Sequence, residues 1–292
     1  MKIETAILKR KFRNYYPLIL NIFPPFIYIL LFFYIPMVIL LVISFWKSGF
    51  MTLEPVFTLE NYKNFFSDPN YIKILLNTFL IITGTMLLLF IIGYPIGYFL
   101  GRIIKKYDSL IIFLMIVPIE IGFLVRVYAW KIVLSKSGII SSFLLTIGLI
   151  KEPMRILLYS KAAVVLVLIH EWLPYVVIPV YISLKGISNE IIGAAKDLGA
   201  TKWDIFKEII FPLSIPGLFA SFVLIYIPML GEFAIPTIVG GASSLMLGNI
   251  IDSQFMAAGN WGLGCAVGAI LLFLSIILIG IVIKISGLEK LM

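Results

Sequence analysis

The sequence has little charge, one cysteine and one histidine, and these shortages exclude several classes of protein. Charged residues make up 13% of the 292 residues, whereas hydrophobic residues make up 61%. A soluble domain has about 25% charged and roughly 45–50% apolar residues, so a water-soluble globule is excluded. An aromatic content of 14% excludes a disordered or collagen-like chain. The lone cysteine, Cys265, excludes a disulfide scaffold and a cysteine-rich metal site.

Motifs for ATP binding and for catalysis are also missing. No Gly-Lys dipeptide occurs, so the chain lacks the phosphate loop of P-loop ATPases. No Gly-x-Ser-x-Gly elbow is present, and the only histidine, His170, has no second histidine with which to form a zinc motif. We therefore expect no enzymatic activity, no metal and no cofactor in this chain. Any ATP that drives it must be bound by another polypeptide.

Six apolar stretches are long enough to cross a membrane as helices. A bilayer core about 30 Å thick requires about 20 apolar helical residues. A seventh uncharged run, 233–251, is interrupted by proline, glycine and serine, so we predict that it lies outside the membrane or re-enters it. The sequence thus predicts an all-α integral membrane protein with a domain over 18–284 and tails at 1–17 and 285–292. The predicted spans are 18–45, 73–101, 109–134, 161–184, 212–232 and 261–284.

Lysine and arginine residues are concentrated on the side of these spans that holds both termini. Cytoplasmic segments of membrane proteins carry an excess of these residues. We therefore expect a multi-pass protein with both termini in the cytoplasm. The net charge of +8 fits this bias and a contact with lipid headgroups, and we expect no nucleic acid partner.

One loop on the predicted cytoplasmic side, 185–211, is unusually long and amphipathic. It predicts two short helices, 189–198 and 201–210, with Gly199 as a left-handed residue between them. Thr201 and Asp204 have the spacing of a capping box. Such a hairpin either lies on the lipid surface or docks a partner protein that moves the spans.

The loop resembles the EAA loop of binding-protein-dependent ABC importer permeases. The residues that match at the family's spacing are Ala194, Ala195, Gly199, Ile209 and Pro212. Gly193 stands where the family has glutamate, and Phe211 where it has leucine; Glu190, one helical turn earlier, is the candidate for the missing charge. The resemblance implies that this loop couples the spans to an ATPase. The coupling residues implied are Glu190, Gly193, Ala194, Ala195, Asp197, Gly199 and Ala200.

Other motifs are similar to those of the spermidine/putrescine permease group. They are Val117-Pro118, the run 126–130, Gly231-Glu232-Phe233, Gly240-Gly241 and Gly248-Asn249. This resemblance implies a type I, MetI-like permease in a bacterial inner membrane that works by alternating access. It also implies a second permease subunit as a heterodimer partner, two cytoplasmic subunits that bind ATP and Mg²⁺, and an external substrate-binding protein.

Carboxylates inside the predicted spans indicate a pathway for cations. An ionisable group in a bilayer costs about 2.5–3.5 kcal/mol, so it usually serves function. With a rise of about 1.5 Å per residue, Glu120 and Glu171 lie roughly 16 and 15 Å deep, while Arg126 lies near the outer edge. Aromatic rings add cation–π contacts to ammonium groups. The predicted pathway residues are Glu120, Tyr128, Trp130, Glu171, Trp172, Tyr175 and Glu232.

Other functions remain open at this level. Within the importer interpretation, the substrate is either a polyamine, another small amine, or an anion for which Arg126 would matter more. An ion-coupled secondary transporter would also use carboxylates at the midplane but would need no docking loop. A non-transport membrane scaffold would tolerate neutralisation of Glu120 and Glu171.

Overall fold

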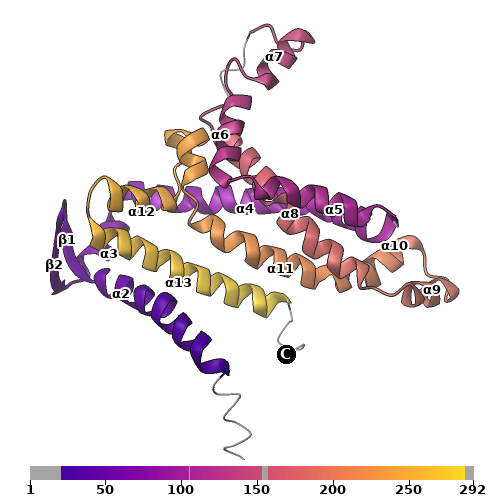
Figure 1. Cartoon of the computed structure of the whole chain (residues 1–292), viewed down its shortest axis with the longest axis horizontal. Coiled ribbons are helices and arrows are strands. Elements are labelled where there is room, and N and C mark those ends of the chain that lie inside the picture. The colour runs from indigo at the N-terminus through magenta and orange to yellow at the C-terminus, as the bar shows by residue number, and fades with distance from the viewer. Residues whose placement is uncertain (1–20, 105, 153–156, 287–292) are drawn as a thin grey trace, which may run out of the picture.

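The computed structural model describes residues 21–104, 106–152 and 157–286, so the predicted tail 1–17 and most of the tail 285–292 lie outside the described residues. Five helices are long and apolar enough to cross a membrane, and a bent helix pair makes a sixth span if its two parts cross together. Five of the predicted spans therefore correspond to continuous helices, and the third corresponds to the bent pair. Four long helices run side by side through the molecule (Figure 1). They are α4 (Pro69–Tyr98), α8 (Lys161–Lys185), α11 (Phe211–Leu230) and α13 (Trp261–Ser286).

The first span covers Asn21–Ile43, and α2 (Ile35–Ile43) forms its second half after a π-helical turn, Leu30–Tyr34. None of the residues in these two elements is buried. A short antiparallel hairpin of β1 (Trp46–Gly49) and β2 (Thr52–Phe57) follows, and then α3 (Glu60–Ser67). The hairpin was not predicted, because its exposed strands lack the alternation of apolar and polar residues that marks a half-buried strand.

Glycines allow α4 and α8 to pack closely. A side chain on Gly93 or Gly97 would overlap Val176 or Val180, because its Cβ carbon would lie 2.7 Å from a valine methyl carbon. Small residues at helix contacts permit such close approach in membranes. The main core, which includes Leu89, extends from this contact to α11 and α13.

The third predicted span, 109–134, is not one continuous helix. It consists of α5 (Asp108–Ile116) with a 3₁₀ turn at Val117–Glu120, followed by α6 (Phe123–Val133) at an angle of 92°. Pro118 lacks the backbone N–H of a helix interior, and Gly122 has an extended ψ of 131°. Together they bend the chain, and α7 (Ile139–Thr146) follows α6.

The predicted cytoplasmic loop forms α9 (Asn189–Asp197) and α10 (Lys202–Ile205). The second predicted helix was expected to end at residue 210, but it continues through a π-helical turn, Phe206–Ile210, into α11 as one helix. Pro212 cannot donate a backbone hydrogen bond, and the wider turn directly before it lets the helix continue.

The run 233–251 forms no membrane-spanning helix, as predicted. It contains two short helical turns, Pro236–Gly240 and Ala242–Ser244, and the first half of α12 (Leu247–Met256). The first turn packs against α6 and α8, which places this segment beside the bend described above.

We expect Gly97→Ala to destabilise the protein, because overpacking of a close helix contact costs about 1–3 kcal/mol. The matched control is Gly280→Ala in α13, where a Cβ atom would meet nothing within 4 Å. Thermal unfolding of the detergent-solubilised protein should give a lower midpoint for Gly97→Ala only. Equal midpoints for the two variants would contradict the close packing of α4 and α8.

Candidate functional site

The bend between α5 and α6 is held by Arg126. Its Nη1 atom donates a hydrogen bond to the backbone oxygen of Pro118 at 2.9 Å, which ties α6 to the turn before it. Glu120 is the last residue of that turn and its side chain is exposed. Within the described ranges Glu120 has no ion-pair partner. It therefore lies at a bend of the chain, and not along the straight helix from which its depth was derived.

A buried ion pair joins α6 to α8. The Nη2 atom of Arg126 lies 2.6 Å from Oε2 of Glu171, and the side chains are 14% and 3% exposed. Arg126 thus neutralises one of the predicted pathway carboxylates. The Oε1 atom of Glu171 has no hydrogen-bond partner and lies 3.6 Å from Nδ1 of His170.

The predicted aromatic residues are divided among different surroundings. Trp130 packs edge-on against His170 at 5.2 Å and so belongs to the ion-pair region. Trp172 contacts Tyr175 at 5.3 Å, and its indole Nε1 is buried without a partner. Tyr128 is 52% exposed, and its nearest cation is Lys131 at 5.9 Å.

Glu232 stabilises the backbone of the residues that follow it. Its Oε1 atom accepts hydrogen bonds from the backbone N–H groups of Ala234 at 2.9 Å and Ile235 at 3.1 Å. Backbone N–H groups at the start of a helical turn need such acceptors. The carboxylate thereby fixes the segment that packs against α6 and α8.

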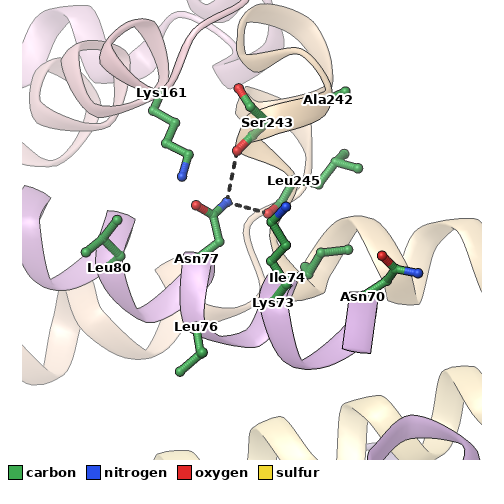
Figure 2. A pocket seen from close by; sticks show the side chains of 10 residues that line it. All are labelled: Asn70, Lys73, Ile74, Leu76, Asn77, Leu80, Lys161, Ala242, Ser243 and Leu245. Atoms are coloured by element: carbon green, nitrogen blue, oxygen red, sulfur yellow. Dashed lines mark hydrogen bonds between the residues drawn. The ribbon is translucent and has the colours of Figure 1, made fainter. Parts of the chain in front are cut away.

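A basic cavity of about 740 Å³ lies at the end of α4 and α8 that is far from α9 (Figures 1 and 2). Figure 2 shows Lys73 and Lys161 on two sides of Asn77, whose Nδ2 atom donates to the backbone oxygens of Ser243 at 3.3 Å and Leu245 at 2.8 Å. None of the predicted pathway residues lines this cavity. Sequence reasoning missed it, because it assembles three segments that are distant in the chain.

The left-handed glycine and the capping box that were predicted for the hairpin of α9 and α10 are confirmed. The Ser188 hydroxyl accepts a hydrogen bond from Ile191 N, Gly199 has a φ of +84°, and Thr201 and Asp204 form the capping box. A side chain on Gly193 would meet nothing within 4 Å, so this position has room for the family's glutamate.

The residues of the EAA-like stretch divide into two sets by their contacts with the main core. Ala195 and Ala200 pack against the main core, which attaches the hairpin to the spans. The other residues are exposed or half-exposed. These are Glu190, Gly193, Ala194, Asp197 and Gly199.

Two large apolar side chains beside these residues are strongly exposed. Leu198 is 89% and Trp203 is 67% exposed. Sequence reasoning did not single them out, although their signal was visible as large apolar residues in a polar hairpin.

Polar side chains anchor this hairpin to the spans. Arg102 donates to the backbone oxygen of Ile187 at 2.9 Å and to the side-chain oxygen of Asn189 at 3.1 Å. On the same end of the molecule, Asp108 accepts from Tyr181 at 2.6 Å and pairs with Lys185. These contacts were not predicted, because they depend on which helix ends meet.

Comparisons with known proteins agree with this architecture. The family model described as "Binding-protein-dependent transport system inner membrane component" matches residues 93–286. The spermidine/putrescine transport system permease protein PotB of Escherichia coli strain K12 is 35% identical over 240 residues, which cover 82% of this chain and 86% of that protein.

Two solved structures share the fold. One is a bacterial ABC transporter involved in the import of the acidic polysaccharide alginate, with a TM-score of 0.77, 17% identity and coverage of 96% of this chain and 98% of that chain. The other is the MetNI methionine ABC transporter, with a TM-score of 0.53, 21% identity and coverage of 72% and 92%. The chain therefore belongs to the family of binding-protein-dependent transport system inner membrane components, as a multi-pass permease subunit of an ABC importer with the type I, MetI-like fold.

Proposed function

We propose that this chain forms part of the membrane pathway of an ATP-driven polyamine importer. The observation that carries the proposal is the 35% identity to a spermidine/putrescine permease across 82% of this chain. In the proposed complex, a second permease subunit pairs with this chain, and two cytoplasmic ATPase subunits bind ATP and Mg²⁺. An external binding protein delivers the polyamine. In this proposal the ATPase subunits, and not this chain, carry the catalytic sites.

The hairpin formed by α9 and α10 is the proposed ATPase contact. It is held to the spans by Arg102 and presents Leu198 and Trp203 to its surroundings. Exposed apolar side chains on a polar hairpin are typical of a binding surface. Because α10 continues directly into α11, a displacement of the hairpin acts on a membrane span without a flexible joint. In the proposed complex, both termini and the hairpin lie in the cytoplasm.

At the bend between α5 and α6, the distribution of charge favours a cationic substrate over an anionic one. Arg126 is neutralised by Glu171, so it offers no free positive charge to an anion. Glu120 is exposed at the bend, and the exposed ring of Tyr128 follows it on α6. A carboxylate and an aromatic face are the groups that bind ammonium ions. In the proposed pathway Glu120 is therefore the first contact, and Glu171 becomes available when α6 moves. The rest of the proposed pathway is lined or supported by Trp130, Trp172, Tyr175 and Glu232.

The experiment that tests this function measures uptake of labelled spermidine and putrescine into vesicles that contain the complete complex and its binding protein. We expect ATP-dependent uptake of at least one polyamine. Vesicles that hydrolyse ATP but import neither polyamine would contradict the substrate assignment and leave the permease assignment unchanged.

In the same assay we expect Glu120→Gln to raise the KM for the polyamine about tenfold or more, because a hydrogen bond to a charged group contributes about 1.5–3 kcal/mol. The matched control is Glu60→Gln, an exposed carboxylate in α3. If both variants transport like the unmodified chain, Glu120 is not a substrate contact.

Leu198→Ser should reduce the amount of ATPase subunit that co-purifies with this chain, because it removes the most exposed apolar side chain of the hairpin. Leu149→Ser is the control, since Leu149 is 70% exposed in the segment after α7. Quantitative immunoblotting of the purified complex makes the comparison. Unchanged co-purification of the ATPase with Leu198→Ser would favour a hairpin that lies on the lipid surface.

Arg126→Gln should destabilise the protein strongly, by about 3–5 kcal/mol, since it leaves the buried Glu171 carboxylate unpaired. The double variant Arg126→Gln with Glu171→Gln should recover much of that loss. Thermal unfolding of the single and double variants gives the coupling free energy between the two side chains. Additive effects would show that the two side chains do not interact.

A further inference from the structure

The basic cavity at the far end of α4 and α8 continues into an apolar groove. Lys161, the first residue of α8, lines both the cavity and a second hollow of about 510 Å³. The second hollow is otherwise apolar. Its lining residues are Ile92, Ala162, Val165, Leu166 and Ile169. One side chain thus marks the boundary between a polar compartment and an apolar one.

The polar compartment has positive charge without a counter-charge. Neither Lys73 nor Lys161 forms an ion pair with any residue that the structure describes, and both side chains are exposed. Asn70, Asn77 and Ser243 add hydrogen-bonding groups around them (Figure 2). Two lysines without carboxylates repel a polyamine, so this compartment is suited to an anion.

The groove lies between α4 and the first turns of α8, because Ile92 lines it from α4 while Ala162 and Ile169 line it from α8. The polar cavity involves the same two helices, with Asn77 on α4 and Lys161 on α8. The two hollows therefore adjoin at Lys161.

We propose that this site binds one anionic phospholipid from the membrane leaflet that lies opposite to α9. Lys73 and Lys161 bind its phosphate, and one acyl chain lies in the groove between α4 and α8. The dimensions agree with this occupant. Lys161 begins its span, at headgroup level, and the eight residues from there to Ile169 extend about 12 Å toward a bilayer midplane roughly 15 Å away.

The two adjoining compartments favour a phospholipid, because each suits a different part of that molecule. A small soluble anion would use the lysines and leave the apolar groove empty. An acidic segment of a partner protein would also need to bury backbone polar groups in an apolar groove, at a cost in free energy. A phospholipid satisfies both compartments with one molecule, and basic sites between membrane helices are suited to anionic headgroups.

Native mass spectrometry tests the proposal on the full chain, purified in mild detergent with the subunits that accompany it. The probes are phosphatidylglycerol and phosphatidylcholine with identical acyl chains. We expect at least fivefold stronger retention of phosphatidylglycerol, since each lysine near a headgroup contributes about a fivefold factor. Lys73→Gln with Lys161→Gln should abolish this preference. Ala162→Leu, which enlarges a side chain that lines the groove, should reduce retention of both lipids.

Two matched variants serve as controls. Lys63→Gln removes an exposed lysine of α3, and Gly280→Leu adds a side chain at an open helical glycine away from the groove. Neither should change lipid retention, and thermal midpoints establish that each variant is folded; Ala162→Val replaces Ala162→Leu if the latter is not. A preference that survives loss of both lysines would overturn the proposal. Weaker attachment of a protein subunit with unchanged lipid retention would assign the cavity to a protein partner instead.

Discussion

The buried ion pair between Arg126 and Glu171 is the interaction on which the arrangement around the third and fourth spans depends. A single charge inside a membrane protein is costly, whereas a close pair on two helices shares that cost. Arg126 also binds the backbone oxygen of Pro118. The guanidinium group of Arg126 therefore neutralises the Glu171 carboxylate on α8 and also holds the bend before α6. Glu120 is left as the exposed carboxylate at that bend.

The helix α8 connects this region to the other functional end of the molecule. Fourteen residues separate Glu171 from Lys185, a rise of about 21 Å along one helix. At its far end, α8 pairs through Lys185 with α5 and leads into α9. Its close contacts with the glycines of α4 pack the two helices into one unit. In the proposed transport cycle, the ATPases move the hairpin, and this unit and α11 carry the motion to the ion pair.

Much of the fold could be predicted from the sequence because the bilayer imposes simple rules. The length of apolar runs predicted six spans, and local side-chain chemistry predicted the caps at Thr201 and the left-handed Gly199. The bend at Pro118 was missed because a proline is tolerated in some membrane helices and breaks others, and only the tertiary contacts decide. The hairpin after α2 was missed because its exposed strands lack an alternating pattern. The lengthening of α10 into α11 was missed because a π-helical turn carries the helix past Pro212.

The candidate site was harder to predict than the fold. Charge in an apolar run identified Glu120, Arg126 and Glu171, but it gave no information on which of them pair. Glu171 and Arg126 are on different helices, and their contact depends on the angle of α6. Glu232 was expected near the outer end of its span, but its hydrogen bonds to Ala234 and Ile235 could not be inferred from spacing alone.

The central claim is that ATP hydrolysis by partner subunits drives polyamine import through this chain. The most direct measurement is ATP hydrolysis by the complete complex in liposomes, with and without a polyamine-loaded binding protein. We expect the loaded binding protein to stimulate hydrolysis and the empty one to stimulate it less. Hydrolysis that does not respond to the loaded binding protein would contradict the claim.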